Sequence, residues 1–232
     1  NSAVLAKYGE TVVLVTVVMS KNNVPFDYMP LKVDYEERFY AAGKIIGSRF
    51  IRREGRPSEE AILSGRLVDR TIRPLFDNRI RREIQVVVTV LAIDEENDPD
   101  FVGLLGASVA LGISEVPWGG PVGGVRVAKI GGKYVINPNR SEFLRPEIVF
   151  KTFVSGSTDK INMIELGGNE VQEKDVLGAF GLAKEEINKL IDFQKIIIKE
   201  VGKSKAEVVM AEIDSELRAA VEHRKVAVRP ID

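Results

Sequence analysis

The residues best suited to binding chemistry lie in one stretch, residues 47–57, with the sequence GSRFIRREGRP. Phe50 stands among arginines there, shortly before Arg52 and Arg53, and glycines flank the group. Single-stranded nucleic acids are bound by this combination, because arginines neutralise phosphates while an aromatic ring stacks on a base. A second interpretation stays open, in which this is a solvated loop whose Phe50 packs inward.

A second basic feature is the spacing of Arg66, Arg70 and Arg73 on a predicted helix over residues 58–73. At about 100° per residue, these arginines fall within an arc of roughly 60°. Asp69 can pair with only part of this stripe, and a phosphate backbone is one partner that matches guanidinium geometry. Internal salt bridges to other strands are the alternative. Apolar residues occupy much of the remaining helix surface: Leu63, Leu67, Val68 and Ile72.

Both features belong to a basic island in a chain of net charge −1. Residues 43–82 hold eleven Lys/Arg and five Asp/Glu, a net of +6, so the remainder carries −7. The placement of charge matters more than its total, and a local excess indicates a local anionic ligand.

The composition excludes several other kinds of site. The chain has 232 residues, 44% of them hydrophobic, and no cysteine, which excludes disulfides, thiolate metal sites and a cysteine nucleophile. A cysteine-free chain fits a reducing cytoplasm. The single histidine, His223, cannot build a multi-histidine metal site and is expected on a solvated helix. No run approaches the roughly 20 apolar residues of a membrane span, and the N-terminus lacks a signal-peptide pattern.

The hydrophobic periodicity predicts the elements that must position these residues. Strand periodicity begins near Thr11, almost at once, which indicates that the chain begins inside a domain. The order of strands and helices favours an α+β fold, with a mixed sheet, packed helices and a helical C-terminal extension. Strands are predicted at residues 11–18, 31–37, 84–93, 122–130, 133–137, 148–154 and 161–166, and helices at 58–73, 101–114, 172–202 and 205–223.

Several longer motifs in order carry a family resemblance. Residues 40–45 (YAAGKI), 50–59 (FIRREGRPSE) and 66–76 (RLVDRTIRPLF) closely resemble the first RNase PH-like domain of the bacterial polynucleotide phosphorylase family. Residues 106–111, 116–123 and 136–138 match in the expected order. The resemblance runs from Ala3 to about Val209. It implies an RNase PH-like (ribosomal protein S5 domain 2-like) core domain over residues 1–202 and the start of a helical linker domain over 203–232.

The resemblance also implies a function, a polyribonucleotide nucleotidyltransferase that degrades mRNA from the 3′ end by phosphorolysis. Such enzymes use Mg²⁺ and inorganic phosphate, bound mainly outside this domain, act as homotrimers in the cytoplasm and join degradosome-type partners. Ile51 replaces the family's second aromatic, and Arg49 looks like an additional residue in the loop. The resemblance assigns no catalytic residue or metal ligand to this chain, and it assigns RNA binding to Phe50, Arg52, Arg53, Arg66, Arg70 and Arg73.

The family's metal-binding aspartates lie in its second core domain, on strands similar to two strands of this chain. By an approximate alignment, Val149 and Ile164 occupy the corresponding positions, and apolar side chains cannot ligate Mg²⁺. Glu165 is expected to point to the other face of its strand from Ile164, because neighbours on a strand alternate. Two alternatives remain: a non-catalytic RNA-binding ring subunit of exosome type, and a single-domain RNase PH, which the missing aspartates disfavour.

Overall fold

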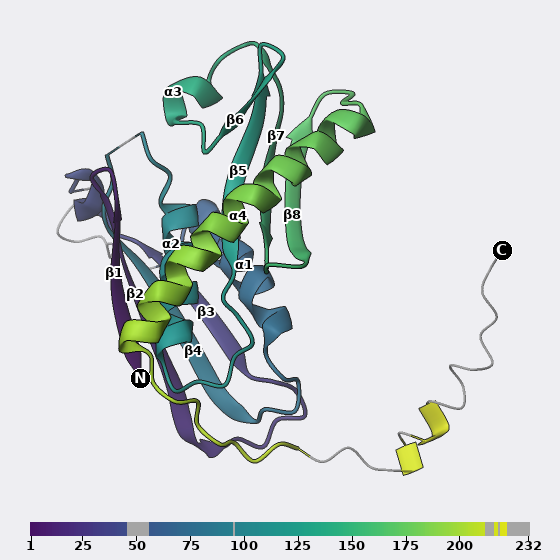
Figure 1. Ribbon diagram of the computed structural model, residues 1–232. Helices are drawn as coiled ribbons and strands as arrows, with labels where there is room; N and C mark the ends of the chain where they lie inside the picture. Colours follow the sequence, from purple (N-terminus) through teal and green to yellow (C-terminus); the bar gives the residue numbers. More distant parts are fainter. Residues whose placement is uncertain (46–55, 95, 212–215, 218, 222–232) are drawn as a thin grey trace.

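The computed structural model describes residues 1–45, 56–94, 96–211, 216–217 and 219–221. Phe50, Arg52, Arg53 and His223 lie outside the described residues, as does the single residue Glu95. Within the described residues the chain forms two sheets, with helices on and between them (Figure 1).

The first sheet has four strands in the order β1-β2-β4-β3. The pairs β1–β2 and β2–β4 are antiparallel, and β3 lies parallel to β4. Val13, Val15 and Val17 of β2 are completely buried while the residues between them are half-buried, so one face of this central strand lies in the core. The four strands are β1 (Ser2–Tyr8), β2 (Thr11–Asn23), β3 (Leu31–Glu37) and β4 (Arg82–Ala92).

Two helices cover this sheet, α1 (Glu59–Ile72) against β3 and α2 (Pro99–Ile113) against β1 and β2. The small residues of α2 let its backbone approach the sheet closely. A Cβ added at Gly106 would lie 2.8 Å from Val15 Cγ2, which is closer than real Cβ contacts allow. The main hydrophobic core fills the space between the sheet and these helices.

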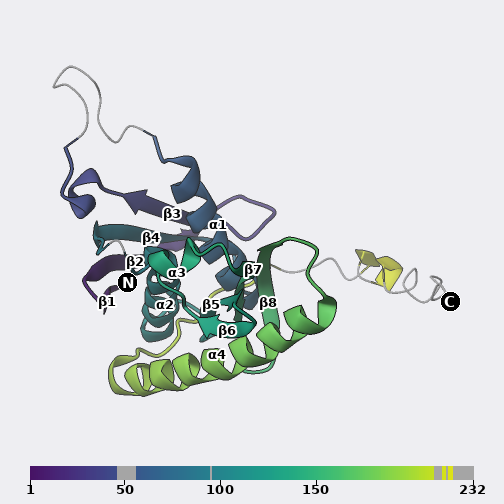
Figure 2. The ribbon, with the colours of Figure 1, turned by 90° about the horizontal axis from the view of Figure 1, so that it is seen from above.

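The second sheet is antiparallel throughout, in the order β6-β5-β7-β8. The long helix α4 (Glu173–Val201) packs against β5 and β7, while α1 contacts β8. Figure 2 shows α4 and α1 on opposite sides of this sheet. The remaining elements are β5 (Gly123–Ile130), β6 (Lys133–Ile136), α3 (Arg140–Phe143), β7 (Ile148–Gly156), β8 (Ile161–Gly168), η1 (Phe39–Ala42) and η2 (Arg73–Leu75).

The α+β class is confirmed, but the expected single mixed sheet is two sheets, of which only the first is mixed. Strand β1 and the short helix α3 had not been predicted. In β1 the side chains are at most half-buried, so its apolar residues give little periodic contrast. The predicted division after residue 202 coincides with the end of α4, and the division into domains itself stays a prediction.

The predicted helix over residues 205–223 is wrong for residues 205–211, which have no helical backbone. This segment runs along the core instead, because its amides bond to other parts of the chain. Ala206 N–H donates to Glu115 O, and Ala211 N–H donates to Arg79 O. Ala206, Val208 and Met210 pack on the main core, an alternation typical of extended backbone. Further along, the described helical residues are 216–217 and 219–221.

Candidate nucleic-acid interface

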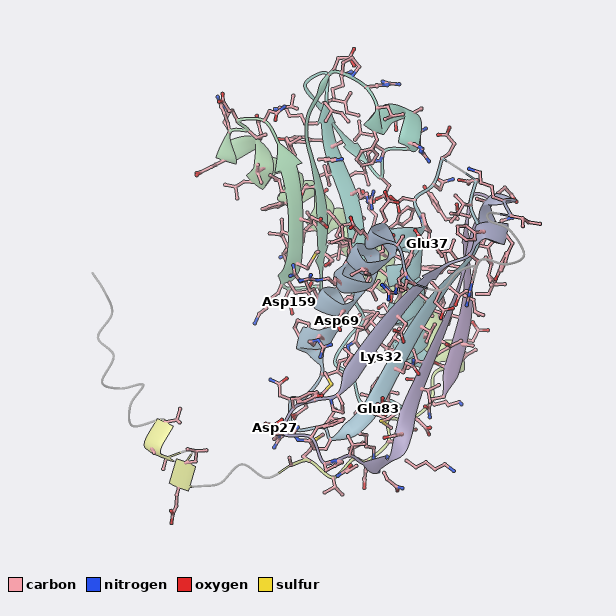
Figure 3. The ribbon with its side chains drawn as sticks, turned by 180° about the vertical axis from the view of Figure 1, so that it is seen from behind. Asp27, Lys32, Glu37, Asp69, Glu83 and Asp159 are labelled. Atoms are coloured by element: carbon pink, nitrogen blue, oxygen red, sulfur yellow. The ribbon has the colours of Figure 1, made fainter. Side chains whose placement is uncertain are left out.

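The start of α1 is tied to the end of β3. Ser58 caps the helix, accepting a hydrogen bond from Ala61 N–H at 2.9 Å, and its hydroxyl donates to Glu37 Oε2 at 2.6 Å. Glu59 and Glu60 lie in the first turn, where their negative charge interacts favourably with the positive end of the helix dipole. Figure 3 labels Glu37 near the start of α1 and Asp69 near its end. The helix that carries the arginines is therefore held at its N-terminus.

Arg66 and Arg70 lie on the side of α1 that faces β8, and both are exposed. They line a cleft of about 240 Å³ between the helix and this edge strand. Neither forms an ion pair or a side-chain hydrogen bond with the described part of the chain. The other residues of the cleft are Leu63, Leu67, Met163, Ile164 and Glu165.

Arg73, predicted with the other two, has a different environment. Its Nε and Nη2 donate to the two carboxylate oxygens of Asp69 at 2.9 and 2.5 Å, and Nη2 also donates to Leu31 O at 3.0 Å. This forked contact joins the end of α1 to the start of β3. Each of the two interpretations therefore applies to part of the arginine stripe. Arg73 pairs internally, while the guanidinium groups of Arg66 and Arg70 stay available to a ligand.

The apolar side of α1 also differs in one position from the expectation. Leu67, Val68 and Ile72 are buried as predicted, but Leu63 is 59% exposed. Leu63 lies one turn before Leu67 and faces the cleft, where no strand of the described residues covers it. The uncovered leucine makes the rim of the cleft apolar next to the arginines.

A buried polar bridge sets the spacing between the two walls of the cleft. The hydroxyls of Thr71 on α1 and Ser155 on β7 lie 2.8 Å apart, and both are fully buried. Asn162 of β8 accepts from Ser155 Oγ at 3.3 Å and donates through Nδ2 to Thr71 O at 2.7 Å. These three residues were not predicted as part of the site. Their only signal is polarity within otherwise apolar strands and helix faces, which does not identify partners.

The strand register decides where the residues near the cleft point. Phe153 pairs with Glu165 and Val154 with Ile164, so Glu165 and Ile164 face opposite sides of the sheet, as predicted. Val149 lies four residues before Phe153 and shares its face, which is opposite to that of Ile164. The approximate alignment that set Val149 and Ile164 as counterparts of two aspartates on one metal ion therefore needs correction, because these two positions do not face one site.

A second charged cluster lies where α1, α2, β3 and β5 meet. Arg126 bonds to Asp100 at 3.0 Å and also contacts Asp98, the N-cap of α2. Burial raises the pKa of Asp100 to about 6, and the nearby Asp98 carboxylate adds to this rise. Tyr35 is buried beside it, and burial together with the Asp100 charge raises the pKa of its hydroxyl. This cluster joins the two sheets and was not predicted from the sequence.

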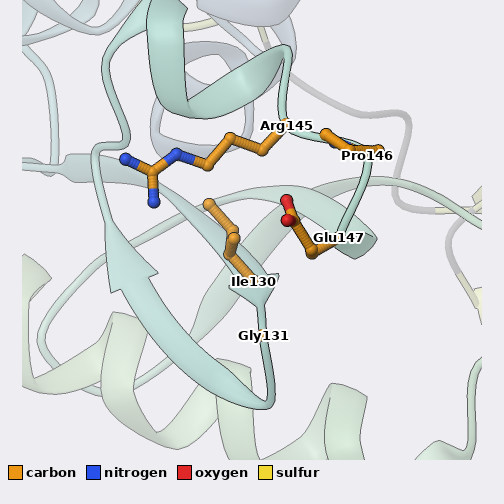
Figure 4. Close-up of a pocket in the computed structure, with 5 residues that line it drawn as sticks. All are labelled: Ile130, Gly131, Arg145, Pro146 and Glu147. Atoms are coloured by element: carbon orange, nitrogen blue, oxygen red, sulfur yellow. The ribbon is translucent and has the colours of Figure 1, made fainter.

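A larger open hollow of about 470 Å³ lies at the turn between β5 and β6 (Figure 4). Its lining includes one arginine, Arg145, and one carboxylate, Glu147. The two arginines Arg66 and Arg70 lie at the cleft beside α1 and not at this hollow. The same is true of the polar bridge between α1 and β8. The cleft between α1 and β8 is thus the better candidate for a polyanion.

Across residues 1–45, 56–94, 96–211, 216–217 and 219–221, no group of three or more His, Cys, Asp or Glu side chains is arranged to hold a metal ion. In the same residues, no helix is both long and apolar enough to cross a bilayer.

Several curated proteins resemble this chain in sequence. A protein of Anoxybacillus flavithermus (strain DSM 21510 / WK1) named polyribonucleotide nucleotidyltransferase is 49% identical over 219 residues, which cover 94% of this chain and 31% of that protein. The protein of the same name from Heliobacterium modesticaldum (strain ATCC 51547 / Ice1) is 48% identical, with 95% and 31% covered. The chain thus spans about a third of the length of these relatives.

Solved structures show the same fold at low identity. A chain of the Archaeoglobus fulgidus exosome with RNA bound to the active site superposes with a TM-score of 0.64 at 22% identity, covering 82% of this chain and 81% of that one. A chain of an archaeal exosome core superposes with a TM-score of 0.62 at 17% identity, covering 84% and 81%. Two family models match consecutive stretches of the chain: "3′ exoribonuclease family, domain 1" over residues 1–117, and "domain 2" over residues 120–186. With both models matched in order, the chain belongs to the 3′ exoribonuclease family.

Proposed function

We propose that this chain is the RNA-gripping, non-catalytic first core domain of a polyribonucleotide nucleotidyltransferase, a phosphorolytic 3′-to-5′ exoribonuclease. The relatives at 48–49% identity carry that name. The observation that carries the proposal is the pair Arg66 and Arg70, which line an open cleft without an internal partner among the described residues. Guanidinium groups left available in this way suit the phosphates of a single strand.

The loop residues Phe50, Arg52 and Arg53 extend this proposal by resemblance. They lie outside the described residues and precede α1 in the sequence. Arg73 enters the proposal only as the residue that holds the end of the helix, because Asp69 and Leu31 O already occupy its guanidinium.

The remaining expectations concern the full-length protein. We propose that Mg²⁺ and inorganic phosphate act there, with their ligands mainly outside this chain, because the resemblance places the family's metal-binding aspartates in its second core domain. A homotrimer, degradosome-type partners, a cytoplasmic location and a linker domain beginning at residue 203 complete the proposal. The family resemblance supports them, together with the cysteine-free composition for the location.

Salt-dependent binding tests the arginine pair. For single strands, log K falls against log salt with a slope of about −0.7 per phosphate contact. The double variant R66A/R70A should therefore lose affinity for a fluorescent A10 oligonucleotide and flatten this slope by about 1.4. The matched control is K189A/K195A, which removes two exposed cations from α4 on the far side of the second sheet. An unchanged slope in R66A/R70A would refute the proposal.

Activity measurements test the division of labour. Phosphate-dependent release of ADP from poly(A) with Mg²⁺ should be absent for this chain and present for the full-length enzyme. Robust release by this chain alone would favour a single-domain RNase PH. A full-length protein that binds RNA without releasing ADP would favour a non-catalytic ring subunit.

A further inference from the structure

The cleft beside α1 has a negative wall as well as a positive one. Arg66 and Arg70 are one helical turn apart and share a face. Across the cleft lies Glu165 of β8, whose register partner Phe153 packs into the main core beside α1. The side chain of Glu165 therefore extends on the α1 side of the sheet.

The opposite charges do not neutralise each other. Within the residues that the structure describes, Arg66, Arg70 and Glu165 make no ion pair within 4.0 Å and no side-chain hydrogen bond. Glu165 is exposed, and only its backbone carbonyl is engaged, as the acceptor of Thr152 Oγ1 at 3.0 Å. A ligand that offers an anion to one wall and a hydrogen-bond donor to the other would satisfy all three groups.

A carboxylate would repel a phosphate placed next to it, so Glu165 would weaken binding of a uniform polyanion. It can only accept hydrogen bonds. In a single strand of RNA the group that donates beside each phosphate is the ribose 2′-hydroxyl, which DNA lacks. A carboxylate facing two arginines therefore matches a ribose–phosphate unit better than a deoxyribose one.

The size and lining of the cleft agree with one such unit. Its volume of about 240 Å³ lies below the roughly 300–1,000 Å³ of pockets that enclose whole small ligands. Leu67 and Met163 give it apolar surface, and Met163 itself packs against the main core. A sugar ring has apolar C–H surface to set against such side chains.

The two walls are also held at a set distance. Asn162, next to Met163 on β8, bonds to the carbonyl oxygen of Thr71, next to Arg70 on α1. Because the cleft is preformed, binding costs little conformational freedom. The loss of the ligand's 2′-hydroxyl should therefore appear directly as a lower affinity.

We propose that this cleft binds one ribonucleotide unit of a single strand, with Arg66 and Arg70 on the phosphate and Glu165 accepting from the 2′-hydroxyl, so that Glu165 selects RNA over DNA. This inference rests on the proposed function, because it takes the ligand to be single-stranded nucleic acid.

The test compares A10 with the all-deoxy dA10, measured by fluorescence anisotropy on this chain and its variants. The native chain should bind A10 about ten- to a hundredfold more tightly than dA10, the worth of one hydrogen bond to a charged group. E165A should bring the RNA-to-DNA ratio towards one and raise the affinity for dA10, because a negative charge is removed. E165Q should raise the affinity for dA10 equally but keep part of the ratio, because its amide oxygen still accepts. E185A, which removes an exposed carboxylate on α4, should leave the ratio unchanged.

The outcomes separate this inference from the proposed function. If R66A/R70A weakens binding of both strands while E165A leaves the ratio unchanged, the role of Glu165 is refuted and the RNA-binding proposal stands. If R66A/R70A changes neither, the RNA-binding proposal itself fails. Competition with AMP distinguishes a free nucleotide: displacement of A10 by AMP at micromolar concentration, lost in E165A, would overturn the assignment to a unit of a strand. Thermal unfolding of each variant checks that it is folded.

Discussion

Asn162 Nδ2 donates to the main-chain carbonyl of Thr71 over 2.7 Å, and this bond joins the edge strand β8 to the arginine helix α1. The two residues are 91 positions apart in sequence and belong to the two halves of the fold. Each stands next to a residue that lines the cleft, Met163 and Arg70 respectively. The width of the cleft therefore depends on a contact that neither half can make alone.

We expect N162A to destabilise the protein by about 1 kcal/mol, the net worth of a typical hydrogen bond, and to weaken RNA binding although Asn162 carries no charge. Urea unfolding and A10 titration measure the two effects. The bridge predicts coupling with S155A, because Ser155 also bonds to Asn162. The double variant should differ from the sum of the single variants by about 0.5 kcal/mol or more. Additive energies together with native affinity would show that the bridge does not hold the cleft.

Arg73 should matter for folding more than for RNA binding. R73A removes a forked contact to Asp69, which is 24% exposed at its side chain, together with the bond to Leu31 O. We expect a loss of about 1–2 kcal/mol in unfolding free energy, because the contact is partly solvated. The salt slope for A10 should stay native, in contrast to R66A/R70A. R73K keeps the charge without the planar fork and should recover only part of the stability. A flattened slope in a fully stable R73A would return Arg73 to the RNA interface.

Local pattern predicted the elements around the site better than it predicted their partners. Hydrophobic periodicity located β2, β3 and α1, because it depends on neighbours in sequence. Membership of two separate sheets depends on contacts between distant residues, which periodicity does not report. The same limit applies to the cleft: the spacing of Arg66 and Arg70 was visible, but the opposing Glu165 was recognised only as pointing away from Ile164.

The error beyond α4 has a similar origin. The mostly charged residues 205–223 were predicted as a helix, although Ala206, Val208 and Met210 alternate in the manner of extended backbone. Three residues are too few for alternation to outweigh composition. The decisive contacts, such as Ala206 N–H to Glu115 O, are tertiary.

Asp100 should give the protein a distinct pH dependence. Its pKa is raised to about 6, first by burial and then by Asp98, whereas an unfolded aspartate titrates near 3.9. Between about pH 4 and 6 the folded protein therefore holds a proton that the unfolded chain has released, so this group's contribution to stability falls as pH rises. D100N abolishes that titration. We expect the unfolding free energy of D100N minus that of the native protein to increase from pH 4 to 6 and to level off above.

Asp77 provides a control of opposite sign. Its exposed carboxylate accepts from Arg79, which lowers its pKa to about 2. The contribution of Asp77 to the free energy of unfolding is present above the pKa of the unfolded chain and is lost as the pH falls through about 2. As the pH rises from about 2 to 4, the unfolding free energy of D77N minus that of the native protein should therefore fall. From pH 4 to 6, where the corresponding difference for D100N changes, it should stay constant. If the D100N difference were flat from pH 4 to 6, Asp100 would be ionised in the folded protein throughout that range.

Lys205 fastens the segment after α4 to the end of α2. Its ammonium donates to three carbonyl oxygens, those of Leu111 at 2.8 Å, Gly112 at 3.1 Å and Ser114 at 2.8 Å. A cation at this position satisfies terminal carbonyls and opposes the negative end of the helix dipole. Burial lowers the pKa of Lys205, so part of this gain is offset by desolvation. We expect K205M to reduce the unfolding free energy by about 1–2 kcal/mol.

The neighbouring Lys203 is the matched control, because its ammonium makes one exposed contact of 3.4 Å to Asn1 O. K203M should change stability by less than about 0.5 kcal/mol. Hydrogen exchange adds a local measurement. The amide of Ala206 donates to Glu115 O only while the segment is docked, so K205M should speed its exchange and K203M should not. Equal exchange rates in the two variants would mean that the apolar residues Ala206, Val208 and Met210 hold this segment without the lysine.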